Sequence, residues 1–347
     1  MTKAEQLRAL AARRVLVKDG AYGTAIQKLG LGEAQFRGNV ALEREQRGNN
    51  DLLNLTQPDA IEAICIAYAQ AGAHVLATNS FNANAISQAD YDAAHLVDDI
   101  NIAGAAIVRR VADRFSTDEA PRFVAGAVGP TNKTLSLSPD VADPGYREVS
   151  FDEVVSVYEG QVRALANGGV DFILVETVFD TLNAKAAVVA TKNVEREIGR
   201  DLPLMLSMTL TDLSGRNLSG HTVEAFWATV RHADPLTIGL NCSFGAEALR
   251  PHLKALHARA ATLVMAYPNA GLPNDLGEYD EGPGETARQV AEWLEEGLVD
   301  IVGGCCGTTP EHIAAIAREC AGAIPRRPAT RTSDMVLAGL EPLEIAS

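Results

Sequence analysis

The sequence predicts a closed barrel of eight parallel strands that alternate with helices, the (β/α)8 or TIM-barrel fold. Eight short apolar runs follow one another, and each leads through a polar or glycine-rich turn into a helical stretch. The 347 residues, 47% of them hydrophobic, are enough for one such barrel. No G-x-G-x-x-G motif follows the first run, which argues against an open dinucleotide-binding sheet.

The apolar runs indicate where the strands lie. A predicted short helix over residues 4–14 precedes the first run, Val15-Leu16-Val17. The other runs cover residues 74–77, 123–128, 172–175, 203–208, 238–242 and 263–267, and an eighth ends at Val302. Helical patterns cover residues 60–71 and 83–114, the second as one long or broken helix. Since barrel active sites lie at the carboxyl ends of the strands, we expect the functional residues in the turns that follow these runs.

The predicted barrel spans residues 1–324, and residues 325–347 are expected to form a linker-like tail. This tail begins with Pro325-Arg326-Arg327-Pro328 and lacks a clear periodic pattern. Two connections, 29–58 and 131–150, are longer than a minimal barrel unit needs. Loops of this length are often functional lids, and plain surface excursions explain them equally well.

Composition excludes several classes of protein. The formal net charge of −15 argues against nucleic acid or an anionic membrane as the main partner, and leaves docking to a basic partner open. The charged N-terminus has no long apolar stretch, so we expect no signal peptide or membrane span and a cytoplasmic location. Five cysteines, two of them adjacent, do not resemble a disulfide framework. Cys65 and Cys320 lie in helical patterns and are expected to be buried apolar groups.

Three cysteines are candidate metal ligands. Cys305 and Cys306 stand among glycines in Gly303-Gly304-Cys305-Cys306-Gly307, just before a helix start at Thr309-Pro310. Glycine tolerates unusual backbone conformations, which lets both sulfurs turn to one side. Cys242 ends the sixth run in a similar setting. Catalytic zinc takes three protein ligands and keeps one position open, so these residues predict such a site, with a vicinal disulfide or inert thiols as the alternatives.

Zinc held by three thiolates carries a formal charge of about −1, which suits it poorly to activating water. It suits the binding and deprotonation of a substrate thiol, followed by alkyl transfer to sulfur. Two acidic residues at strand ends, Asp19 and Glu176, suggest recognition of an ammonium group. Backbone N–H groups near Gly20 and Gly304 and the Thr78 hydroxyl are candidates for holding a carboxylate. Taken singly, each has an ordinary structural explanation, such as a turn or a helix cap.

Several motifs resemble the homocysteine S-methyltransferase family, above all the N-terminal module of cobalamin-dependent methionine synthases. They are Asp19-Gly20, Gly48-Asn49-Asn50-Asp51-Leu52-Leu53, Thr78-Asn79-Ser80-Phe81, Gly129-Pro130-Thr131-Asn132, Glu176-Thr177-Val178-Phe179-Asp180, Gly239-Leu240-Asn241-Cys242, Pro268-Asn269-Ala270-Gly271 and Gly303-Gly304-Cys305-Cys306-Gly307. The resemblance implies a barrel whose zinc is bound by Cys242, Cys305 and Cys306 and whose substrate is homocysteine. It also implies that the amino acid's polar end is held by Asp19, Gly20, Thr78, Glu176, Asn241 and Gly304.

In the family that this chain resembles, the methyl group comes from methylcobalamin and ultimately from methyltetrahydrofolate. We expect no folate- or cobalamin-binding module after Leu340-Glu341-Pro342-Leu343, which departs from the full-length pattern of that family. We therefore expect a corrinoid- and methyltetrahydrofolate-binding partner, either a separate chain or a module from which this one was excised. A stand-alone methyltransferase that uses S-methylmethionine or betaine is the alternative. A non-catalytic homocysteine- or zinc-binding module and a redox-sensing cysteine pair are the hypotheses from other classes.

Overall fold

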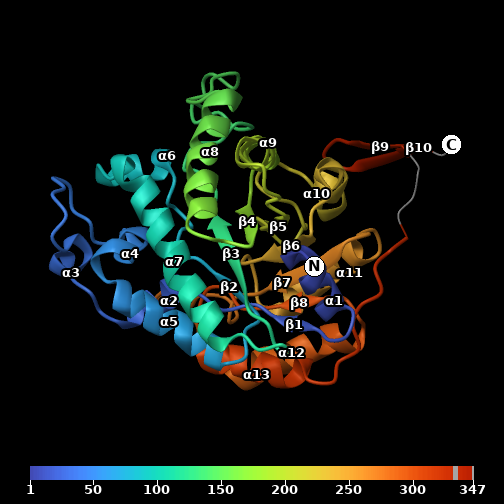
Figure 1. Cartoon of the computed structure of the whole chain (residues 1–347). Helices are drawn as coiled ribbons and strands as arrows, with labels where there is room; N and C mark the ends of the chain where they lie inside the picture. The colour runs from blue at the N-terminus through green and yellow to red at the C-terminus, as the bar shows by residue number, and fades with distance from the viewer. Residues whose placement is uncertain (331–334, 346–347) are drawn as a thin grey trace.

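The computed structural model describes residues 1–330 and 335–345 and shows eight parallel strands around a central axis (Figure 1). They are β1 Leu16–Val17, β2 Val75–Ala77, β3 Phe123–Val128, β4 Phe172–Val178, β5 Leu204–Met208, β6 Thr237–Asn241, β7 Leu263–Tyr267 and β8 Ile301–Val302. From β2 to β8 each strand pairs with the next in sequence, and β8 pairs with β1. Between β1 and β2 an isolated bridge from Lys18 to Val75 closes the circle. The predicted (β/α)8 barrel is confirmed.

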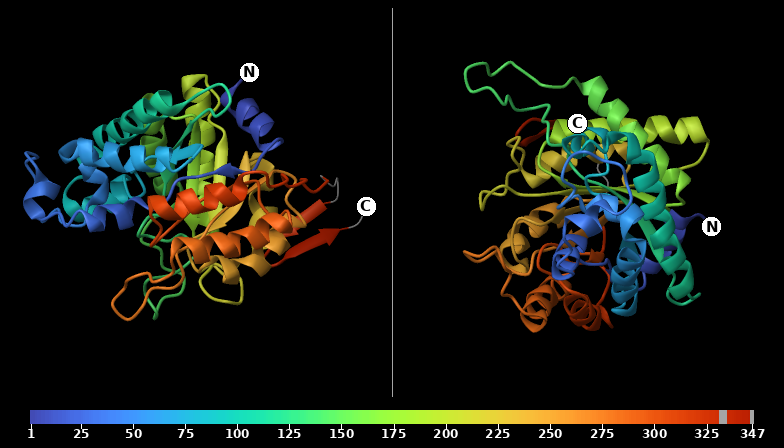
Figure 2. Two further views of the ribbon diagram at one scale, coloured as in Figure 1. Left: turned by 90° about the horizontal axis from the view of Figure 1, so that it is seen from below. Right: turned by 90° about the vertical axis from the view of Figure 1, so that its left-hand side faces the viewer.

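Helices surround the strands (Figure 2). The larger ones are α5 Pro58–Gln70, α7 Val97–Phe115, α8 Phe151–Asn167, α9 Thr181–Ile198, α10 Val223–Val230, α11 Ala246–His257, α12 Pro283–Glu295 and α13 Pro310–Cys320. The predicted long or broken helix over 83–114 is broken, because a short helix, α6 Ala85–Gln88, and two 3-10 turns precede α7. The expected helix start at Thr309-Pro310 is confirmed, with Thr309 as N-cap. In the described part of the chain, no helix is long and apolar enough to cross a membrane.

The strands bury both faces, and alternate side chains separate into two cores. One core lies inside the barrel and includes Leu16, Phe123 and Met265. Their neighbours Val17 and Val124 point outward and pack with the surrounding helices. Side chains of α1 Lys3–Ala11 belong to the inner core, so this helix covers the amino end of the barrel. Since that end is covered, the carboxyl end is where a ligand can enter.

The carboxyl end carries the longer connections. Connection 29–58 contains α3 Glu33–Arg37, a 3-10 turn at Asn50–Leu52 and α4 Leu53–Thr56, and follows α2 Tyr22–Lys28. Connection 131–150 has no helix or strand. Together with the loops after β5 and β7, it projects to one side of the molecule (Figure 2). The barrel mouth is therefore surrounded by loops.

The tail is more ordered than the sequence predicted. Arg326 is buried and its guanidinium binds Asp300, which anchors the start of the tail to the barrel. Strands β9 Met335–Ala338 and β10 Pro342–Ile345 form an antiparallel hairpin that packs on α10. Apolar residues such as Leu337 and Leu343 lie opposite each other in this hairpin. Each strand has only four residues, so the sequence pattern did not distinguish the hairpin from a linker. Residues 331–334 and 346–347 of the expected tail lie outside the described residues.

Candidate metal centre and active site

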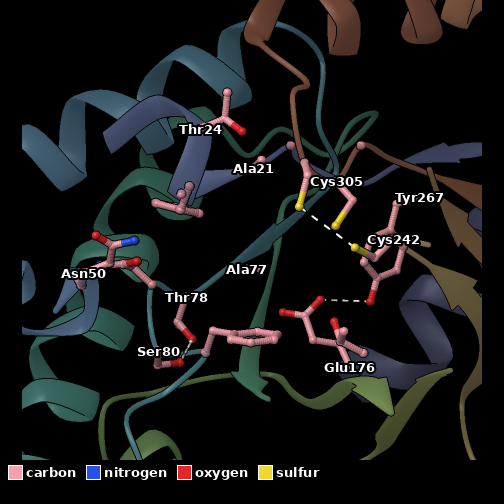
Figure 3. Close-up of a pocket in the computed structure, with 18 of the residues that line it drawn as sticks. Ala21, Thr24, Asn50, Ala77, Thr78, Ser80, Glu176, Cys242, Tyr267 and Cys305 are labelled. Atoms are coloured by element: carbon pink, nitrogen blue, oxygen red, sulfur yellow. Dashed lines mark hydrogen bonds between the residues drawn. The ribbon is translucent and has the colours of Figure 1, made fainter. Parts of the chain in front are cut away.

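The three cysteines predicted as ligands lie together at the barrel mouth (Figure 3). Their sulfurs are all within 4.8 Å of one another, and the Sγ atoms of Cys242 and Cys306 are 3.9 Å apart. All three are free thiols. Zinc–sulfur bonds of about 2.3 Å in a tetrahedral arrangement place two sulfurs about 3.8 Å apart. The donor set and its spacing therefore fit zinc.

Cys242 faces the other two cysteines because the chain turns sharply after β6. Cys242 and Ser243 both have left-handed backbone conformations, with φ of 58° and 64°. Such conformations cost energy in residues other than glycine, and persist where surrounding contacts fix them. Here the Cys242 N–H donates to the Tyr267 carbonyl at 3.1 Å. The Ser243 hydroxyl accepts a hydrogen bond of 2.6 Å from the Leu210 N–H.

The turn after β8 orients Cys305 and Cys306. The Cys305 N–H donates to Pro268 at 2.8 Å, and the Cys306 carbonyl accepts from Ala270 at 2.9 Å, so both residues are tied to the end of β7. Gly307 alone of the three glycines here has a positive φ, 80°. At Gly304 a side chain is excluded by contact, because a Cβ would lie 2.4 Å from the Thr308 hydroxyl. Gly307 is thus needed for its backbone conformation, and Gly304 because a side chain would not fit there.

The environment of the sulfurs favours a thiolate. Hydrogen bonds from Cys305 and Cys306 lower the pKa of Cys242 to about 3, and a hydrogen bond from Asn269 acts in the same direction. Asn269 is buried, and its Oδ1 has no hydrogen-bond partner among the residues described. The same contacts with Cys242 raise the pKa of Cys305 and raise that of Cys306 to about 11, so Cys242 is the cysteine that most readily carries the negative charge.

A cavity of about 260 Å³ opens beside the sulfurs. Most of the predicted site residues line it, namely Gly20, Thr78, Glu176, Cys242, Gly304, Cys305 and Cys306. Figure 3 shows the sulfur of Cys242 on one side of this space and Asn50 and Thr78 on the other. The cavity is smaller than pockets that take drug-sized ligands, so its size suits a small molecule such as an amino acid.

Glu176 presents a carboxyl group to the cavity. It extends from β4, and the hydroxyl of Tyr267 donates a hydrogen bond of 2.9 Å to it. Burial raises the pKa of Glu176, while the nearby Lys18 opposes that shift. On the opposite side, the Thr78 hydroxyl accepts a hydrogen bond of 2.9 Å from the Ala127 N–H and lies 2.5 Å from the Ser80 hydroxyl. Carboxylate and hydroxyl groups therefore face each other across the cavity.

Two predicted substrate-binding residues, Asp19 and Asn241, do not line the cavity. The Asp19 carboxylate is buried and binds the Lys18 ammonium at 2.8 Å and the Ala77 N–H at 2.7 Å. Both side chains form hydrogen bonds with other protein groups, so their direct contact with a substrate stays a prediction. The Asp19 carboxylate is turned away from the cavity by its ion pair with the neighbouring Lys18.

The Asn241 side chain joins three strand ends. Its Oδ1 accepts hydrogen bonds from the Thr177 N–H at 3.0 Å and from the Ser207 hydroxyl at 2.6 Å. Its amide nitrogen donates to the Thr177 hydroxyl at 2.8 Å. These bonds hold Thr177, which has a left-handed φ of 58°, directly after Glu176. Asn241 therefore positions the chain that carries Glu176.

Sequence reasoning assigned no role to several residues of the cavity wall, among them Lys18, Tyr267 and Asp51. Lys18 and Tyr267 could have been found from strand alternation, because each lies two residues after an inward-facing neighbour. Asp51 comes from connection 29–58, which thus contributes to the site, whereas no residue of connection 131–150 lines the cavity. Burial raises the pKa of Asp51 to about 7.

These features define a class: a (β/α)8 barrel with a cluster of three cysteines that could hold a metal ion, beside an amino-acid-sized cavity. The family model for homocysteine S-methyltransferases matches residues 16–320, and the chain belongs to this family. It is accordingly a methyltransferase. The resemblance inferred from the sequence motifs is confirmed at the level of the family.

Solved structures of the homocysteine methyltransferase MmuM from Escherichia coli have the same fold. The metallated form superimposes with a TM-score of 0.67 at 21% identity, over 90% of this chain and 98% of that chain. The oxidized form gives a TM-score of 0.66 at 22% identity, over 88% and 95% of the two chains. At these identities the likeness supports the barrel architecture.

Proposed function

We propose that this chain transfers a methyl group to the sulfur of homocysteine and forms methionine, with zinc held by Cys242, Cys305 and Cys306. The observation that carries the proposal is the group of three free thiols, with two sulfurs 3.9 Å apart, at the mouth of a family-typical barrel. When bound there, zinc supplies a Lewis acid that lowers the pKa of a fourth, substrate thiol while the cysteine ligands keep that sulfur electron-rich.

The residues of the cavity then orient the amino acid. Glu176 receives its ammonium group, held in place by the Tyr267 hydroxyl and by the Asn241 contacts to Thr177. Backbone N–H groups near Gly20 and Gly304 and the Thr78 hydroxyl surround the rest of the polar end. Fixing both ends of a small substrate places its sulfur near the metal ligands and lowers the entropy cost of reaction. Asp19 contributes indirectly, through Lys18.

For the methyl donor we propose methylcobalamin, recharged from methyltetrahydrofolate and presented by a separate chain or module. The sequence motifs shared with cobalamin-dependent methionine synthases support this choice. A cytoplasmic location fits, because a reducing compartment keeps the three thiols available to metal.

The test supplies zinc-loaded protein and homocysteine with methylcobalamin, S-methylmethionine or betaine in parallel. Methionine from methylcobalamin alone supports the proposal and identifies the donor. Methionine from S-methylmethionine or betaine makes the chain a self-sufficient methyltransferase and refutes the corrinoid assignment. If no donor yields methionine while homocysteine still binds, the chain is a binding module. A Cys242→Ser variant with normal folding serves as the control for metal dependence.

A further inference from the structure

Lys18 places an ammonium group in the wall of the cavity. It follows the inward-facing Leu16 at the end of β1, and only 4% of Lys18 is exposed. Its Nζ lies 2.8 Å from the Asp19 carboxylate and 4.5 Å from the centroid of the Tyr267 ring. Burying a charge of this kind is costly unless the group is paired. The ion pair with Asp19 offsets that cost, but it does not explain why a charged side chain lies in the wall of the cavity.

Among the residues that the structure describes, the ammonium group has more N–H donors than it has acceptors. It carries three N–H bonds, and the Asp19 oxygen at 2.8 Å takes one of them. The other Asp19 oxygen already accepts the Ala77 N–H. The face of Tyr267 attracts the charge but accepts no conventional hydrogen bond. Lys18 thus has donors left beside the cavity that it lines.

Lys18 remains charged in this setting. Burial alone would lower the pKa of Lys18, but the carboxylates of Asp19 and Glu176 raise it above its ordinary value. Glu176 binds the hydroxyl of the same Tyr267 whose ring face Lys18 contacts. One tyrosine therefore separates a fixed positive group from a fixed negative group at the edge of one cavity.

We propose that Lys18 is a substrate-binding residue that takes the α-carboxylate of the amino acid while Glu176 takes its ammonium group. The inference rests on the proposed function, because it assumes an amino acid substrate. An amino acid carries its ammonium and carboxylate groups on the same α-carbon, and the pair of Glu176 and Lys18 offers an opposite charge to each. Asp19 then serves as the counter-ion that keeps Lys18 oriented.

The test compares two thiols on zinc-loaded protein by isothermal titration calorimetry. L-Homocysteine carries the carboxylate, and 3-aminopropane-1-thiol has the same thiol and amine without it. The main variant is Lys18→Met with Asp19→Asn, which removes both charges so that no unpaired carboxylate stays buried. Lys18→Arg keeps the positive charge and the pairing with Asp19, and is the matched control. Zinc content and melting temperature establish that each variant is folded and metallated.

We expect the unmodified protein to bind L-homocysteine more tightly than the decarboxylated thiol by roughly 10- to 100-fold, the range for a hydrogen bond to a charged group. The double variant should lose this preference and retain its affinity for 3-aminopropane-1-thiol, while the control keeps the preference. A preference that survives in the double variant refutes the role of Lys18 and leaves the proposed function standing. If neither thiol binds the unmodified protein, the proposed function itself fails.

Discussion

Replacing Arg326 with methionine tests how the tail is attached to the barrel. Its guanidinium is fully buried and binds the Asp300 carboxylate at 2.9 Å. The same group donates to the backbone carbonyls of His257, Ala260 and Thr262. Methionine keeps the apolar stem and removes every one of these bonds. Among the described residues, the Asp300 carboxylate then keeps one hydrogen-bond donor, the Val264 N–H at 2.7 Å.

Breaking a buried ion pair from one side costs about 3–5 kcal/mol, because the remaining charge stays buried. A chain of 347 residues unfolds with an entropy of about 0.7 kcal/mol/K, so this loss corresponds to a fall in melting temperature of about 4–7 °C. Calorimetry at pH 7 measures it. The control is Arg110→Met, which breaks the exposed pair with Glu62 and should cost about 1 kcal/mol or less.

The pH dependence gives a second check on the same variant. Burial already raises the pKa of Asp300, and Arg326 opposes that shift. Without Arg326 the folded-state pKa rises further, so the penalty appears as pH rises above the unfolded value and shrinks in acid. Equal melting temperatures for Arg326→Met and Arg110→Met at pH 7, or a penalty that grows as pH falls, would refute this reasoning.

Three further variants follow from the site and the barrel. Cys242→Ser should lower bound zinc from about one equivalent to a small fraction, whereas Cys320→Ser should leave it unchanged, as measured by atomic absorption. Tyr267→Phe removes the donor to Glu176 and should lower kcat/KM for homocysteine by roughly tenfold, a loss that an unchanged value would exclude. Burial, with Arg122 and Arg14 nearby, lowers the pKa of His74 to about 4. The contribution of His74 to the free energy of unfolding should therefore be fully present above pH 6.5 and fall by up to about 3 kcal/mol towards pH 4. His74→Gln should reduce this loss of stability, as measured by unfolding curves recorded in acid.

The fold was predictable because strand burial leaves a simple signature. Strands in a parallel barrel bury both faces and appear as short apolar runs, and two of these, β3 and β7, have the predicted bounds. The hairpin of β9 and β10 was not predictable in this way. Its stability depends on α10 and on pairs such as Arg216 with Glu341, which lie far apart in sequence.

The cluster of three cysteines was predictable at the level of residue type, because few arrangements explain adjacent cysteines among glycines. The residues that contact the substrate were harder to predict. The ends of the strands show which residues lie near the mouth of the barrel, but not which of two neighbouring side chains points into the cavity. At the end of β1 the inward position belongs to Lys18, and Asp19 turns to its backbone and ammonium partners. A single-residue shift of phase thus exchanges an acid for a base in the cavity wall.

The same end of β1 links recognition to the closure of the barrel. β1 and β2 share no regular ladder, and their seam consists of the Lys18 to Val75 bridge with few backbone bonds, among them the Asp19 N–H to the Val75 carbonyl at 3.0 Å. The Asp19 carboxylate adds a bond to the Ala77 N–H across this seam. Asp19 is therefore required by the barrel whether or not a substrate is present. A loss of activity in an Asp19 variant consequently says little about substrate contact unless the integrity of this seam is measured alongside it.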